Sequence, residues 1–248
     1  AAPPLALSLG IPAGTFMGTV IGWRWTFGIM SALTVILVFW VLAKVPDFPG
    51  QKQGQEFALK SVFTLPGIRP VLFVIFAYVF AHNILYTYIA PFLMQAGIAN
   101  RVDAVLLVFG LASLVSIWIT GVLIDRWLRE LVLISIALFG LSAVALGTAG
   151  TVPAVVYASA AIWGLAFGGA ATLFQTASAK TAGEAADVAQ SMLVTTWNLA
   201  VAGGGIAGGL LLEGAGVGAF PVAVLALLAA TLLVAAAARS HGFPAVRG

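Results

Sequence analysis

The sequence predicts an all-α polytopic membrane protein. Hydrophobic residues make up 62% of its 248 positions and charged residues only 8%, against roughly 25% charged in a typical soluble domain. Charge is also missing over long stretches, and none occurs between Glu130 and Lys180. Because a helix needs about 20 apolar residues to cross a bilayer, this pattern favours membrane spans over one large soluble core.

The charge-free stretches predict eight transmembrane helices. A turn-like segment from Gly147 to Pro153 divides the longest stretch into two spans. The expected spans are Ala1–Gly22, Trp25–Leu42, Val71–Met94, Val105–Ile124, Leu131–Ala149, Val152–Ala171, Met192–Leu212 and Val217–Ala238. The connections Asp125–Glu130 and Lys180–Asp187 are short, so consecutive helices should pack as antiparallel neighbours.

The basic residues predict the orientation of these spans. Nine fall on one side of the expected membrane: Lys44, Lys52, Lys60, Arg69, Arg126, Arg129, Lys180, Arg239 and Arg247. Only Arg24 and Arg101 fall on the other side. The positive-inside rule therefore places the first side, with both chain ends, in the cytoplasm.

A polar connection between the second and third spans predicts the domain organisation. It is rich in Pro and Gly and can form a short interfacial helix from Glu56 to Phe63. We therefore expect two helices in residues 1–44, a cytoplasmic linker with few contacts in 45–70, a six-helix bundle in 71–239 and a cytoplasmic tail in 240–248.

Glycines predict close helix packing in two spans. Those of the first span recur every four residues on one helix face, where another backbone can approach closely: Gly10, Gly14, Gly18 and Gly22. Pro12 should kink this helix. The related glycines of the seventh span are Gly205, Gly208 and Gly209. Ordinary tight packing and a contact that rocks or slides both remain open, and the separation of six spans suggests a repeat of six-helix units.

His82 is the only residue within the expected spans that titrates near neutral pH. Tyr78 and Tyr86 lie four residues to either side and share its helix face, with Asn83 beside it. Leaving such groups unpaired in lipid costs a few kcal/mol each, so they should line a substrate cavity or hydrogen-bond to other helices. Further cavity candidates are Gln175, Trp197 and Asn198.

The charged segment after the fourth expected span predicts a cytoplasmic gate. Its members are Gly121, Asp125, Arg126 and Arg129. Such a cluster can bind helix ends or an opposing half in one state and release them in another. A plain solvated loop is the alternative.

Several stretches resemble the major facilitator superfamily in the right order. The segment from Gly10-Ile-Pro-Ala-Gly14 to Phe27 looks like the antiporter motif and following turn of the fifth and sixth helices of bacterial drug/proton antiporters and sugar-efflux proteins. The segment Gly121–Arg129 resembles the second-half copy of the cytoplasmic loop motif, with Leu128 in place of the usual Gly. Tyr86–Leu93 and Asn198–Gly209 resemble the seventh and eleventh helices of efflux members.

This resemblance implies helices five to twelve of a twelve-helix, two-bundle fold, with residues 1–44 as the last two helices of the N-terminal bundle. It implies a monomeric, multi-pass protein of the cell (inner) membrane that exports a small-molecule substrate by alternating access. Proton-coupled antiport is the expected mechanism, with the coupling residue in the first four helices, which are absent here. A truncated or non-transporting membrane subunit is the alternative.

Other function classes lack their motifs. The chain has no Gly-x-Ser-x-Gly, no His-Glu-x-x-His and no phosphate-binding Gly-x4-Gly-Lys-Ser/Thr loop, so an intramembrane enzyme and nucleotide hydrolysis are disfavoured. It contains no cysteine, and its two histidines, His82 and His241, lie far apart. We therefore expect no metal and no cofactor, and the net charge of +3 does not suggest nucleic acid.

Overall fold

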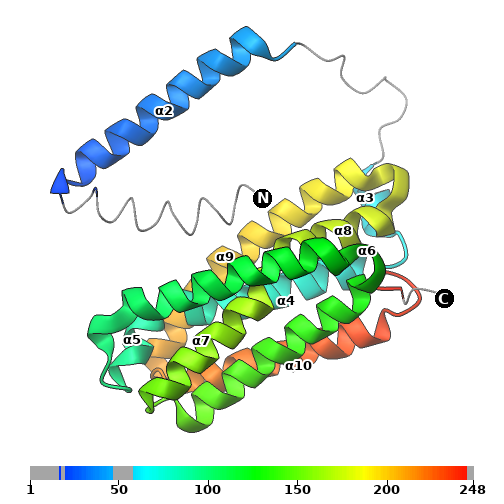
Figure 1. Cartoon of the computed structure of the whole chain (residues 1–248). Helices are drawn as coiled ribbons and strands as arrows, with labels where there is room; N and C mark the ends of the chain where they lie inside the picture. Colours follow the sequence, from blue (N-terminus) through cyan, green and yellow to red (C-terminus); the bar gives the residue numbers. More distant parts are fainter. Residues whose placement is uncertain (1–16, 18–19, 47–57, 245–248) are drawn as a thin grey trace. The chain divides into compact units, whose positions relative to one another are not determined.

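The computed structural model describes residues 17, 20–46 and 58–244, and this part of the chain is helical without a strand. Two compact units divide the chain, one of residues Ala1–Glu56 and one of residues Phe57–Gly248. Figure 1 shows the long helices of the second unit running side by side. The all-α fold predicted from the sequence is confirmed.

The described helix of the first unit is α2, Trp23–Lys44. It begins after Gly22, whose φ of 84° suits glycine, and the Thr26 hydroxyl donates a hydrogen bond to the Gly22 carbonyl at 3.1 Å. Lys44 places a positive charge in the last turn, where the helix dipole favours it. Its sides are apolar all round, which suits a lipid-facing helix.

The second unit contains eight α-helices and two 3₁₀ turns among its described residues. They are α3 (Leu59–Phe63), α4 (Ile68–Thr87), α5 (Ile89–Met94), η1 (Ala99–Arg101), α6 (Val102–Ala149), α7 (Pro153–Phe167), α8 (Ala170–Ala182), η2 (Gly183–Ala185), α9 (Ala186–Ala215) and α10 (Ala219–Ala237). Seven of the eight predicted spans fall on described helices when α6 is counted as two. The first span, Ala1–Gly22, lies almost wholly outside the described residues.

The core of the second unit forms around α4. This helix packs against α9 and α10, while α6 packs against α7 and α10. Tyr78 of α4 meets Phe139 of α6 edge to face, at 5.6 Å between ring centroids. Both side chains are fully buried, as are Trp163 and Phe220, so large aromatic side chains supply much of the packing.

The third predicted span, Val71–Met94, is two helices rather than one. The backbone leaves helical geometry at Tyr88, with φ −112° and ψ 28°, and separates α4 from α5. Pro91 explains the break, because its ring has no N–H to donate and clashes with the carbonyl of Thr87 four residues earlier.

The connection predicted for Asp125–Glu130 is shorter in the structure. The fourth and fifth spans meet within α6, where only Trp127 departs from helical geometry (φ −127°, ψ 29°). Figure 1 shows the two halves of α6 folding back beside each other at this point. The loop predicted for Lys180–Asp187 is also shorter, because α8 continues to Ala182 and α9 begins at Ala186.

The sixth predicted span, Val152–Ala171, extends further and is interrupted. Gly168 and Gly169 separate α7 from α8. A Cβ on Gly168 would collide with the Ser113 backbone of α6, and one on Gly169 would collide with the Thr120 side chain. The Gly169 N–H donates to the Ser116 hydroxyl at 3.1 Å. The two glycines therefore allow the backbone of this segment to lie directly against α6.

The boundaries of the predicted linker and tail need correction. Residues 58–70 belong to the second unit, since Val62 and Ile68 are each only 1% exposed. Phe243, which falls in the predicted cytoplasmic tail, is likewise 1% exposed. Apolar side chains of both segments are buried at the helix ends. The polar composition of these segments does not predict this burial.

Candidate functional site

The face of α4 that the sequence singled out is buried at Tyr78 and His82 and half-buried at Tyr86. Tyr78 is fully buried, and its hydroxyl donates to the Ala166 carbonyl of α7 at 2.8 Å, with the Ser135 carbonyl of α6 at 3.5 Å. Tyr78 therefore does not line a cavity within this unit. It makes the helix–helix hydrogen bond that the sequence left open as the alternative.

His82 lies one turn further along α4 in an aromatic environment. Its ring stacks on Phe167 at a centroid distance of 3.5 Å and an interplanar angle of 7°. Trp163 and Tyr86 each lie at 5.1 Å. The His82 side chain is 7% exposed, and its Nδ1 has no hydrogen-bond partner. The buried Nε1 of Trp163 also lacks one.

Four half-buried rings surround this pair, and we call them the aromatic wall: Tyr86 of α4, Phe109 of α6, Phe167 of α7 and Trp197 of α9. Tyr86 lies 5.9 Å from Phe109, and Phe167 lies 6.1 Å from Trp197. His82 links the two pairs, with contacts to Phe109 and Phe167. The wall thus joins four helices around two nitrogen atoms without partners.

Phe109 and Phe167 were missed as site residues by the sequence interpretation. Phe167 follows Trp163 by four residues and so shares its helix face. The Gly164–Gly168 spacing is the signal that could have located this face, since small residues four apart mark close helix contacts. A Cβ on Gly164 would collide with the Phe109 carbonyl, and the Ser113 hydroxyl donates to the Gly164 carbonyl at 3.2 Å.

The remaining polar cavity candidates are dispersed. The Asn83 side chain donates to the Val79 carbonyl of its own helix at 2.8 Å. Gln175 is exposed on α8, and its backbone carbonyl accepts from Gln190 at 2.9 Å. Asn198 is exposed on α9, next to Trp197. The structure thus brings His82, Tyr86 and Trp197 together and leaves Gln175 outside the wall.

Four glycines of α9 lie against α4 or the following Tyr88, whereas Gly205 and Gly214 do not. A Cβ on Gly208 would lie 2.6 Å from the Tyr88 ring, and one on Gly204 would lie 2.7 Å from the Phe80 carbonyl. A Cβ on Gly209 would lie 2.8 Å from the Tyr88 hydroxyl oxygen. Gly205 has open space at its Cβ position, and its carbonyl accepts a hydrogen bond from Tyr88 at 3.0 Å.

The glycine pattern predicted for the first span cannot be placed in the same way. Gly10, Pro12, Gly14 and Gly18 lie outside the described residues. Gly22 is described, and it precedes α2 in a positive-φ conformation with open space at its Cβ position.

The four predicted gate residues separate into two groups. Gly121, Asp125 and Arg126 are exposed, while Arg129 is half-buried and holds the end of α10. Its guanidinium donates to the carbonyls of Ala235 at 3.1 Å, Ala236 at 2.9 Å and Phe243 at 2.8 Å. The last carbonyls of a helix have no partner within it, so Arg129 acts as a C-terminal cap for α10.

The segment after α10 gathers other helix ends at the same place. Gly242, with φ 99°, lies against Gly67, with φ 94°, at the start of α4. A Cβ on Gly67 would lie 2.5 Å from the Gly242 nitrogen. The Thr181 hydroxyl of α8 donates to the Gly242 carbonyl at 3.4 Å. We call residues 238–243 and these contacts the C-terminal clasp.

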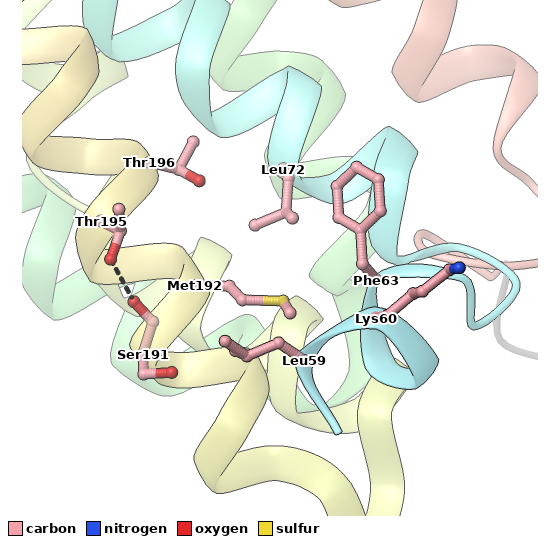
Figure 2. Close-up of a pocket in the computed structure, with 8 residues that line it drawn as sticks. All are labelled: Leu59, Lys60, Phe63, Leu72, Ser191, Met192, Thr195 and Thr196. Atoms are coloured by element: carbon pink, nitrogen blue, oxygen red, sulfur yellow. Dashed lines mark hydrogen bonds between the residues drawn. The ribbon is translucent and has the colours of Figure 1, made fainter. Parts of the chain in front are cut away.

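A separate hollow of about 460 Å³ lies where α3 meets α9. Leu72 of α4 contributes to it, and α3 supplies Leu59, Lys60 and Phe63. Figure 2 shows α9 contributing hydroxyl groups and Met192, with Thr195 hydrogen-bonded to the Ser191 carbonyl at 3.0 Å. None of the predicted cavity residues lines this hollow. Within the described parts of the chain, no three His, Cys, Asp or Glu side chains come together to hold a metal.

Comparison with known proteins agrees with the helical architecture. The family model described as Major Facilitator Superfamily matches residues 1–205. A probable sugar efflux transporter from Mannheimia succiniciproducens is 30% identical over 219 residues, which cover 84% of this chain and 53% of the relative. The purine ribonucleoside efflux pump NepI from Salmonella typhimurium is 31% identical over 214 residues, covering 86% of this chain and 54% of the relative.

The chain thus spans about half the length of the curated relatives it matches. The family match covers most of the chain, and the described spans supply the apolar helices of a multi-pass membrane protein. This chain belongs to the Major Facilitator Superfamily.

Proposed function

We propose that the protein exports a small molecule across the cell membrane by alternating access, as a monomeric proton-coupled antiporter. The observation that carries the proposal is the family match over residues 1–205, together with relatives named as efflux proteins. In an alternating-access mechanism, two helix bundles rock about a substrate site near the middle of the membrane. The second unit supplies one bundle in this proposal, and α2 belongs to the other.

His82 and the aromatic wall are the proposed substrate-facing part of the second unit. His82 and Tyr86 lie in the last two turns of α4, Phe167 ends α7 next to α8, and Phe109 and Trp197 lie within α6 and α9, so none of them is adjacent in sequence to a charged residue. A buried nitrogen without a partner is costly, and a substrate group that pairs with it would offset that cost. Tyr78 has a structural role in this scheme, since its hydroxyl is already paired with α7.

We propose that the protein lies in the cell (inner) membrane with the C-terminal clasp on the cytoplasmic side. Gly67, Arg129, Thr181 and Gly242 meet at one end of the second unit. Arg69, Arg126, Lys180 and Arg239 are close to them in the sequence. A positively charged end is expected on the cytoplasmic side, and this agreement supports the orientation.

Flux in inside-out membrane vesicles tests the proposal. The protein is expressed from its complete coding sequence, and proton-driven accumulation of labelled inosine and of labelled lactose is measured, with and without a proton-conducting uncoupler. We expect uptake of at least one solute class to need the proton gradient. Uptake that survives the uncoupler would exclude proton coupling, and absence of flux for a broad solute panel would favour a non-transporting subunit.

A variant series then tests the site. His82→Ala should weaken substrate binding and leave some proton-driven flux, because coupling is assigned to helices outside this chain. Tyr86→Phe should have a smaller effect in the same direction. Tyr157→Phe is the matched control, since Tyr157 is half-buried on α7 and touches none of the wall rings. Unchanged binding with abolished coupling would instead make His82 the coupling residue.

A further inference from the structure

We propose that the part of the substrate that contacts the aromatic wall is an uncharged planar ring with hydrogen-bonding groups at its edge, such as a nucleobase-like heterocycle. This inference rests on the proposed export function and narrows its substrate class. Three features of the second unit carry it: the arrangement of the rings, the polar atoms left unpaired among them, and the absence of charge around them.

The rings already form a partial stack. His82 lies nearly parallel to Phe167, at 7°, and Tyr78 lies nearly parallel to the same ring, at 9°. Tyr86 stacks on His82 at an angle of 22°. Tyr86, Phe167 and Trp197 each keep part of their surface exposed. A flat ring can extend such a stack over its whole face, and stacking of bases on aromatic side chains is favourable.

Unpaired polar atoms belong to two of the packed rings. Nδ1 of His82 and Nε1 of Trp163 are buried without partners, in side chains exposed by only 7% and 1%. The Tyr86 hydroxyl likewise makes no hydrogen bond within the described residues. An indole N–H can only donate, a phenol can do both, and a neutral imidazole donates at one nitrogen and accepts at the other. A ligand edge that carries both donors and acceptors matches this set, whereas a hydrocarbon ring does not.

Among the described residues of the second unit, no charged side chain belongs to the aromatic wall or is adjacent to it in sequence. α7 contains no charged residue, and the charges of the other wall helices lie at helix ends or at the bend of α6. They are Arg69 of α4, Asp103, Asp125, Arg126, Arg129 and Glu130 of α6, and Asp187 and Glu213 of α9. A charged group at the wall would have no counter-charge in this unit, and burying it unpaired is strongly unfavourable. The recognised ring is therefore uncharged.

Direct binding tests this assignment. The protein from the complete coding sequence is purified into lipid nanodiscs, and binding of labelled adenosine, uridine and indole is measured at equilibrium. We expect saturable binding of adenosine or uridine that exceeds indole binding at least tenfold, because indole carries one donor and no acceptor. A hundredfold excess of glucose should not displace the nucleoside, because a saturated sugar ring lacks a planar face.

Variants locate the site. Phe167→Leu and Trp197→Leu should each weaken nucleoside binding about tenfold, while Trp197→Phe should keep it within about threefold because a ring remains. Trp118→Leu is the control, since this α6 side chain is 71% exposed and belongs to none of the ring pairs of the second unit. Thermal unfolding of each variant identifies loss of fold, and the Trp197→Leu and Trp197→Phe pair still decides the outcome if Phe167→Leu does not fold.

The outcomes separate this inference from the export proposal. Proton-driven export of a sugar, without saturable nucleoside binding, overturns the planar-ring assignment and leaves export intact. Nucleoside binding that depends on Phe167 and Trp197, without flux of any solute, supports the ring site and contradicts export. Equal binding in Trp197→Leu, Trp197→Phe and the unmodified protein overturns the assignment.

Discussion

The Arg129 guanidinium lies 2.8 Å from the Phe243 carbonyl oxygen and so joins the bend of α6 to a residue 114 positions later. The same guanidinium caps α10 through Ala235 and Ala236. Phe243 itself is buried, and its N–H donates to the Ala238 carbonyl at 3.1 Å. One side chain thus satisfies the open carbonyls of a helix end and holds the following segment against it.

Removing this side chain should open the C-terminal clasp. Hydrogen bonds to charged groups contribute about 1.5–3 kcal/mol each, so Arg129→Ala should raise the open fraction more than tenfold. These 248 residues contain no cysteine, so Ala238→Cys places a single reporter thiol in this part of the protein, at a position only 8% exposed. We expect maleimide labelling to accelerate in Arg129→Ala and to stay unchanged in Arg126→Ala, whose side chain is exposed. Equal labelling rates in both variants would show that Arg129 does not hold the segment.

The contact between Gly67 and Gly242 should not tolerate a side chain. Gly67→Ala combines the cost of a positive φ, about 1–2 kcal/mol, with a collision against the Gly242 backbone. Gly183→Ala carries the positive-φ cost alone, because Gly183 (φ 56°) has open space at its Cβ position. Thermal unfolding in detergent should therefore show a larger loss for Gly67→Ala. Matching losses would mean that the clasp relaxes around the added methyl group.

The packing of α9 on α4 should depend on Gly208 and not on Gly205. Gly208→Leu forces a branched side chain into the Tyr88 ring, and overpacking of this kind typically costs about 1–3 kcal/mol. Gly205→Leu points into open space and keeps the carbonyl that Tyr88 uses. Expression level and monodispersity on size-exclusion chromatography should fall for the first variant only. A fall for Gly205→Leu alone would contradict the contact.

The buried hydroxyl of Tyr78 should stabilise the contact of α4 with α7. Tyr78→Phe removes the hydrogen bond to the Ala166 carbonyl and should cost about 1 kcal/mol. Tyr157→Phe is the control, because the Tyr157 hydroxyl makes no hydrogen bond within the described residues. Both are measured by chemical denaturation in mixed micelles. Substrate binding should be unaffected by Tyr78→Phe. A selective loss of binding would show that the Tyr78 hydroxyl contacts the substrate.

Much of the fold was predictable because the physics of membrane insertion is local. Each span must be apolar along its own length, so missing charge located α2 and α10 to within two residues at each end, while α9 begins six residues before its predicted span. The bends were not predictable in the same way. The chain reverses near Trp127 as predicted, but the two halves of α6 meet there at a single non-helical residue and not through a six-residue loop.

By itself, the sequence determined the helical class, the position of the spans, the distribution of positive charge and the resemblance to the superfamily. These properties follow from composition and spacing within single segments. The tertiary structure decided which side chains meet. It paired Arg129 with α10, buried Tyr78 against α7 and placed Phe109, Phe167 and Trp197 around His82. Such contacts join helices far apart in the chain, and they depend on close packing between helix faces that hydrophobicity alone does not distinguish.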